Sequence, residues 1–142
     1  MKDCGYTLRK AYYDKLIASS YSLNAYDTIA PDTVEPPFLL ISSQSAVENS
    51  NKQNFANNVN IQFDIVYKTN KIGEVGQKSV DTWANELLEI IATYPPDYID
   101  LSPNFSMVTR KITNNQATFD FTNDAYIFRR VIIFQHFVAQ LT

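Results

Sequence analysis

The sequence is poor in the residues that most often carry chemistry. It contains one cysteine, Cys4, and one histidine, His136. A single cysteine excludes an internal disulfide framework and a cysteine-based zinc site, and a single histidine excludes metal centres that need two. With three glycines in the chain, there is little material for the Gly-rich loops that bind phosphate groups.

Charge is also sparse and nearly balanced. Charged residues make up 19% of the chain, and the formal net charge is −3. There is therefore no surplus of cations to drive non-specific binding to nucleic acid. No run of about 18 apolar residues occurs, so we expect no membrane partner, and the first ten residues lack the apolar stretch of a secretory signal.

Aromatic and aliphatic residues are plentiful. The 142 residues are 45% hydrophobic and include nine tyrosines and nine phenylalanines. That much apolar surface is enough to build one core, and the length suits one domain, 1–142.

Two segments have the apolar spacing of amphipathic helices. In the first, roughly Tyr6 to Ser20, Leu8, Tyr12 and Leu16 recur every four residues. In the second, about Gln77 to Thr93, the apolar positions fall on one stripe. The stripe comprises Val80, Trp83, Ala84, Leu87, Leu88 and Ile91.

The remaining apolar segments predict strands. Strict alternation makes Val59 to Tyr67 the clearest one. The others are expected around Tyr26–Ile29, Phe38–Ser43, Phe105–Ile112, Ala117–Phe121 and Tyr126–Val138. Turns are expected at Thr113–Asn115, at Thr122–Asp124 and over Lys68–Gly76. The order predicts an α+β domain: an antiparallel sheet with two helices packed against it and long hairpin loops.

A polar, asparagine-rich segment lies between two of these strands. Gln44 to Asn58 has few apolar anchors, so we expect a long mobile loop that becomes ordered against a partner. Glu48, Asn51 and Asn54 are its candidate assembly residues.

Two strands carry features that suit an interface. Asn60, Gln62 and Asp64 form the polar face of the alternating strand, which meets water or a polar neighbour. The last strand is apolar on both faces around Val131 and Ile133, as expected of a strand that is covered on both sides by helices or by a neighbouring subunit.

Arg129 and Arg130 are adjacent in the same strand and must point to opposite faces. An inward arginine needs a carboxylate partner, supplied either within the chain or across a subunit interface. Both arginines are therefore candidate interface residues.

No catalytic constellation is visible. His136 lies among apolar strand residues without a local carboxylate, which favours a structural role. Cys4 is expected in a frayed terminus, and the Asp and Glu residues are scattered. We therefore expect no catalytic residues, no cofactor, no metal and no enzymatic activity.

The order of elements resembles the tail-terminator and head–tail completion proteins of tailed bacteriophages. The segments that carry the resemblance are Leu8–Ala11 in an opening helix, Pro36–Ile41 entering a strand, the strand Val59–Tyr67, the helix Val80–Leu88 and the Arg-bearing strand Tyr126–Phe134. The resemblance covers almost the whole chain, up to Val138.

This resemblance implies a virion structural protein that forms a homo-oligomeric ring. Such rings bind portal, connector or tail tube proteins, and genome DNA passes through them without specific binding. The family carries no catalytic residues. A small-molecule- or peptide-binding α+β module is the alternative, and it could be monomeric.

Overall fold

The computed structural model describes residues 1–69 and 76–141, which form two helices and five strands. In chain order the elements are α1 (Gly5–Ala18), β1 (Ala25–Asp27), β2 (Phe38–Glu48), β3 (Ala56–Thr69), α2 (Gly76–Ile91), β4 (Phe105–Thr122) and β5 (Ala125–Gln140). Both predicted helices are confirmed to within a few residues at each end.

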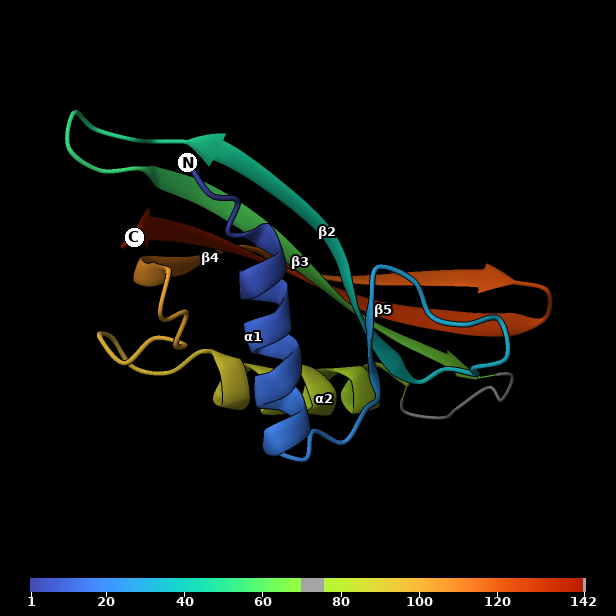
Figure 1. Ribbon diagram of the computed structural model, residues 1–142. Coiled ribbons are helices and arrows are strands. Elements are labelled where there is room, and N and C mark those ends of the chain that lie inside the picture. Colours follow the sequence, from blue (N-terminus) through green and yellow to red (C-terminus); the bar gives the residue numbers. More distant parts are fainter. Residues whose placement is uncertain (70–75, 142) are drawn as a thin grey trace.

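The strands form one sheet in the order β1-β2-β3-β5-β4. The short β1 pairs with β2 in parallel, and all other pairs are antiparallel. Figure 1 shows both helices on the same side of this sheet, with α1 crossing in front of α2. The molecule is therefore a two-layer α+β domain, as the sequence predicts.

Alternation along β3 places the core between the helices and the sheet. Val59, Ile61, Phe63 and Ile65 are fully buried, and they pack in one cluster with apolar residues of both helices. We call the side of the sheet that these residues occupy the helix face and the opposite side the outer face. From α1 the cluster includes Leu8, Tyr12 and Leu16, and from α2 it includes Val80, Ala84, Leu87 and Ile91.

Arg110 of β4 holds the end of α2. Its guanidinium group donates to the carbonyl oxygens of Ile91 (3.2 Å) and Thr93 (2.9 Å), which lie at the C-terminus of the helix. A cation at this end satisfies free carbonyls and complements the helix dipole. Arg110 is therefore occupied in an intramolecular contact.

The expected loop over 44–58 is largely wrong. β2 continues to Glu48 and β3 begins at Ala56, so that Gln44–Glu48 pairs with Asn57–Ile61. Only residues 49–55 connect the strands. The asparagines of β3 occupy a pleated ladder whose cross-strand backbone bonds outweigh their weak intrinsic preference for strands.

The expected turn at Thr113–Asn115 is also wrong. β4 runs unbroken from Phe105 to Thr122, and the ladder with β5 absorbs Thr113 as a bulge between Ile112 and Asn114. A second bulge lies at Val108, and a third interrupts β2 at Ser42. A bulge holds one extra residue without ending the strand, which is why polar residues that resemble a turn remain in the ladder.

The turn at Thr122–Asp124 is confirmed. Thr122 pairs with Ala125, leaving Asn123 and Asp124 as the two turn residues, with φ of 52° and 59°. Positive φ at both central positions matches the right-handed twist of the strands, and Asn and Asp tolerate it well. The Lys68–Gly76 turn falls mostly on residues 70–75, which lie outside the described residues; β3 itself continues to Thr69.

Candidate assembly surfaces

The outer face of the sheet brings together polar residues of β3 and apolar residues of β5 that the sequence singles out. Gln62 of β3 lies opposite Ile133 of β5, and Asp64 lies opposite Val131. Asn60 follows on the same face, and neither helix covers it (Figure 1). The polar side of β3 and the second apolar side of β5 therefore form one surface.

This outer face differs from the prediction in two respects. Val131 and Ile133 are half-buried, because helices cover one side of β5 only. Coverage of both faces by helices is therefore wrong, and coverage of the outer face by a neighbouring subunit stays a prediction. Asp64 is 8% exposed and accepts a hydrogen bond from Gln62 Nε2 (3.1 Å), so this carboxylate is partly shielded from water by its own neighbours.

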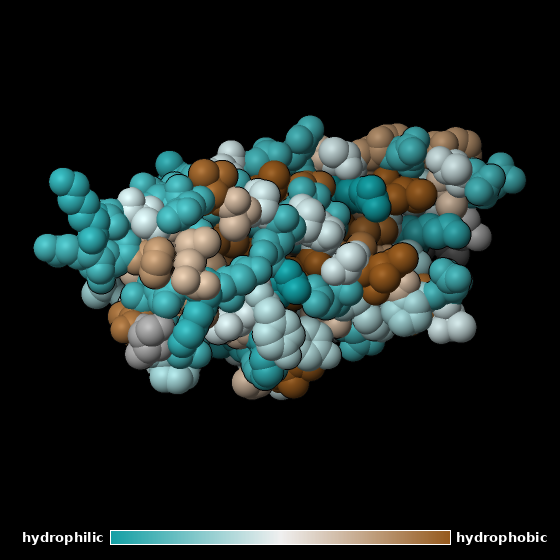
Figure 2. Space-filling view, turned by 45° about the horizontal axis from the view of Figure 1, so that its top comes forward, coloured by the Kyte–Doolittle hydropathy of each residue, from teal (hydrophilic) through white to brown (hydrophobic). Residues whose placement is uncertain are grey.

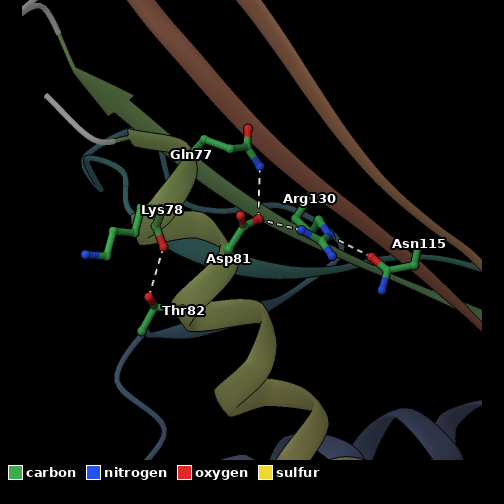
Figure 3. Close-up of polar contacts among 6 residues, drawn as sticks. All are labelled: Gln77, Lys78, Asp81, Thr82, Asn115 and Arg130. Atoms are coloured by element: carbon green, nitrogen blue, oxygen red, sulfur yellow. Dashed lines mark hydrogen bonds and ion pairs between the residues drawn. The ribbon is translucent and has the colours of Figure 1, made fainter. Parts of the chain in front are cut away.

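The two adjacent arginines have different environments. Arg130 points toward α2, where its Nη1 donates to Asp81 Oδ1 (2.5 Å), and its Nε donates to Asn115 Oδ1 of β4 (2.6 Å). Figure 3 shows Asp81 held between Gln77 and Arg130. The carboxylate partner that an inward arginine needs is therefore supplied within the chain, whereas Arg129 is exposed on the outer face.

The β2–β3 connection is organised by one asparagine. Asn51 Oδ1 accepts hydrogen bonds from the backbone N–H groups of Gln53 and Asn54, both at 2.8 Å. Asn51 and Asn54 thus lie at an exposed hairpin tip, and Glu48 ends the strand that leads to it. These three residues are far along the strands from the centre of the outer face.

A second hairpin presents a feature that sequence patterns did not reveal. We define the arm as residues 117–130, the end of the β4–β5 hairpin. Phe119 and Phe121 are 57% and 53% exposed, and their rings contact Tyr126 and Phe128 at centroid distances of 4.8–5.7 Å. Figure 1 shows this hairpin extending beyond both helices. The alternating aromatics of 119–121 and 126–128 are the signal that could have indicated it.

His136 is a structural residue in the core. Its Nδ1 donates to the carbonyl of Val59 (2.9 Å), and its Nε2 accepts from the hydroxyl of Tyr12 (2.6 Å). Burial lowers the pKa of His136 to about 4 and raises the pKa of Tyr12. Both groups are neutral near pH 7 and completely buried, so neither is available to a substrate.

The remaining candidate groups form no reactive centre. Cys4 is 1% exposed, so the expected frayed terminus is wrong there, and burial raises the pKa of its thiol. Glu86 accepts hydrogen bonds from Ser22, and Asp97 and Asp100 border a groove of about 500 Å³ beside α1. Residues 1–69 and 76–141 contain no cluster of three His, Cys, Asp or Glu side chains that could hold a metal ion.

Comparison with known proteins finds similarity in structure. No protein-family model and no curated protein sequence matches the chain. A solved structure, titled "Virion of native gene transfer agent (GTA) particle", contains a chain that superposes with a TM-score of 0.69 at 13% sequence identity. The match covers 96% of this chain and 99% of that chain. It establishes a shared fold over the whole domain.

The low sequence identity limits what this likeness says about function. At 13% sequence identity the likeness shows the fold alone. The described part of the chain also contains no helix long and apolar enough to cross a membrane.

Proposed function

We propose that this protein is a non-enzymatic structural component of a phage-like virion that assembles into a homo-oligomeric ring. The observation that carries the proposal is the whole-chain likeness to a chain of a gene transfer agent virion, with nearly complete coverage on both sides. In this role the protein is part of the particle and binds copies of itself and other virion proteins.

The distribution of surfaces supports a cyclic assembly. The outer face with Asn60, Gln62, Val131 and Ile133 and the aromatic arm lie at different places on the molecule. A ring needs heterologous contacts, in which two different patches of the same chain meet at every interface. A chain with two separate contact surfaces satisfies that requirement.

The finer role follows the resemblance to tail-terminator and head–tail completion proteins. In this role the ring lies at the head–tail junction or in the tail, and portal, connector or tail tube proteins bind its rims. Subunit contacts form through the outer face, with Arg129, Val131, Ile133, Asn60, Gln62 and Asp64. Arg130 supports the arm through its contacts with Asp81 and Asn115 in the same chain. Glu48, Asn51 and Asn54 at the β2–β3 tip are positioned to contact a neighbouring virion protein.

Mass measurement tests the ring. We expect the purified protein, examined by light scattering after size exclusion and by native mass spectrometry, to give one closed oligomer whose images show a central opening. Val131→Asp should weaken this oligomer, because a carboxylate that is buried in a subunit contact without a cationic partner is costly. A chain that is monomeric at every concentration, alone and with the products of neighbouring genes, would favour a binding module and contradict the ring.

A ring around a genome channel should not bind DNA tightly. The net charge of −3 repeats in every subunit, so the summed field repels phosphates. We expect negligible binding of duplex DNA at physiological salt in a fluorescence anisotropy titration. Micromolar or tighter binding with a steep salt dependence would reveal several phosphate contacts and contradict a passive channel.

A further inference from the structure

The last strand of the sheet, β4, has a long open edge. Within residues 1–69 and 76–141, only β5 pairs with it. The bulges at Val108 and Thr113 and the charge of Lys111 interrupt the first part of this edge, as in natural edge strands that avoid pairing with other chains. The second part, Asn114–Thr122, contains no bulge, no proline and no lysine. It is therefore an unprotected template for another strand.

The two-residue turn fixes which backbone groups face this open edge. Thr122 pairs with Ala125 across the turn, and residues that flank such a turn direct their N–H and C=O groups at each other. Alternation then directs away from β5 the groups of Asn115, Ala117, Phe119 and Phe121. The N–H of Phe121 agrees with this direction, since it donates to Asp120 Oδ1 (2.8 Å). Within the described residues, the other three have no backbone partner at this edge.

The opposite side of the sheet also has an open segment, in β2. The short β1 pairs with β2 only as far as Ile41. Beyond the bulge at Ser42, the N–H of Asn49 donates to the carbonyl of Ala56 in β3 (2.8 Å), which fixes the alternation along the strand. The residues that direct their backbone groups to the open edge are therefore Gln44, Ala46 and Glu48. No proline or lysine protects this segment.

The two open segments match residue by residue. In an antiparallel pairing, Asn115, Ala117 and Phe119 meet Glu48, Ala46 and Gln44, in that order. At one end, the Thr113 bulge limits the segment of β4 where the end of strand β2 limits the other. At the other end, Asp120 occupies the next N–H of β4 where β1 covers the next part of β2. Both limits therefore coincide in one register.

The same match sets the orientation of the second chain. Ala117 lies opposite Arg130 and Ala46 lies opposite Val59, so both side chains are on the helix face. Residues that exchange hydrogen bonds in an antiparallel pair have their side chains on one side of the sheet, which places the helices of both chains on the same side. Because β2 and β4 run in opposite directions within one sheet, the strands of the second chain keep the direction of the first. A rotation relates such copies, as a ring requires.

The side chains are compatible with this pairing. Like charges directly opposite one another destabilise a sheet, and here Asp120 and Glu48 each face an uncharged residue. Figure 2 shows apolar residues among hydrophilic ones on the half of the molecule where the arm extends. Phe119 of the arm is 57% exposed, and in this pairing it lies beside the side chain of Gln44. The contact therefore also removes apolar surface from water.

We propose that the open edge of β4 adds as a strand to the open edge of β2 in a second copy, so that one sheet continues from subunit to subunit. Main-chain hydrogen bonds carry the contact, as in other cases of strand addition. A chain cannot pair its own two edges, because they lie on opposite sides of its sheet. The contact is heterologous and can repeat around a ring. The proposal rests on the self-assembly proposed above.

Proline substitution tests the main-chain bonds. Ala117→Pro and Ala46→Pro each remove an outward N–H and place a ring at the edge, while the bonds to β5 and β3 remain. Either variant should assemble at least about tenfold more weakly, because several backbone bonds are prevented. Ile112→Pro is the control, since Ile112 lies on the same face of β4 but before the Thr113 bulge. Comparable circular dichroism and unfolding midpoints verify that the three variants fold.

Disulfide trapping tests the register with every backbone bond in place. Thr118 and Ser45 are opposite each other on the outer face in the proposed pairing. Thr118→Cys protein is mixed with Ser45→Cys protein under mild oxidation, and we expect a covalent dimer from the mixture. Ala46→Cys replaces Ser45→Cys in the matched control and should give no such product, because its side chain is on the other face. The native Cys4 is buried and is common to all samples.

The outcomes separate this contact from the ring itself. Equal trapping with Ala46→Cys, or a covalent dimer of Thr118→Cys protein alone, overturns the proposed pairing. A wild type that assembles, with no loss in either proline variant at Ala117 or Ala46 and no trapped dimer, overturns the strand addition and leaves the ring in place. A wild-type chain that never self-associates overturns both, so the two failures are distinguishable.

Discussion

Two regions on the helix face of the sheet differ in their exposure to water. In the covered region, Phe134 lies against Tyr12 and Phe63 and is 0% exposed; in the arm, Phe121 lies against Tyr126 and is 53% exposed. Both are aromatic residues of the two strands that form one antiparallel hairpin. The difference arises because the helices cover one part of the face and leave the other bare.

The covered region and the arm should contribute to different free energies, that of folding and that of assembly. Apolar surface that is removed from water within the chain stabilises the fold, and the same surface left exposed can stabilise only a complex. Substitutions in the covered region should therefore change the free energy of unfolding, and substitutions in the arm should change self-association instead.

The largest contrast is expected from paired alanine substitutions. Phe134→Ala should lower the free energy of unfolding by about 3–5 kcal/mol, because it opens a cavity at a fully buried ring. Phe121→Ala should change it by less than about 0.5 kcal/mol. Urea unfolding of both variants, at concentrations where the protein is monomeric, measures the difference. A large loss in Phe121→Ala would show that the arm belongs to the folding core.

A smaller effect is expected from pH and is confined to the covered region. In the unfolded chain His136 has its ordinary pKa of 6.5, whereas in the folded chain burial lowers its pKa to about 4. As pH falls below 6.5, His136 therefore binds a proton in the unfolded state but stays neutral in the folded state. The free energy of unfolding decreases progressively until the pH reaches the folded-state pKa of about 4. Between about pH 7 and about pH 5 the loss should be about 2 kcal/mol.

The measurement needs a matched variant, because carboxylates also titrate at acidic pH. In His136→Gln this part of the pH dependence should disappear, whatever the variant's stability near pH 7. The difference between the two pH profiles isolates the histidine. Identical slopes for the wild type and His136→Gln would contradict a histidine that is buried in its neutral form.

The smallest effect is expected at the boundary between the two regions. The Arg130–Asp81 pair ties the base of the arm to α2, and the two side chains are 22% and 47% exposed. Because water screens such a pair, Asp81→Asn should reduce stability by only about 0.5–1 kcal/mol. Arg129→Met, on the outer face, should have no measurable effect on the monomer. A double-mutant cycle of Arg130→Met with Asp81→Asn checks that the loss belongs to the pair.

Sequence patterns predict the parts of the fold that local periodicity controls. The stripe of α2 and the alternation of β3 identify both elements and their buried sides, because one face of each must leave water. The same logic predicts that Arg129 and Arg130 point apart. It fails over Gln44–Asn58 and at Thr113–Asn115, where polar residues that favour turns are held in ladders by partner strands distant in the sequence.

The candidate site could be predicted only in part for a similar reason. Asn60, Gln62 and Asp64 were assigned to one face from alternation alone, and register with β5 adds Val131 and Ile133 beside them. The arm was missed because alternating aromatics look the same whether or not a helix covers them. The placement of the two helices over the sheet decides that, and the residues of the arm carry no signal of it.

The bulges at Val108 and Thr113 have a consequence for how this hairpin can change during evolution. Loss of one residue elsewhere in β4 would turn over every side chain beyond it and move Phe119 and Phe121 to the opposite face. Loss of Thr113 would leave Ile112 opposite Phe134 and Asn114 opposite Ile133, so the ladder would merely become regular. Single-residue deletions in related chains should therefore accumulate at these two positions, with the orientation of the aromatic row preserved.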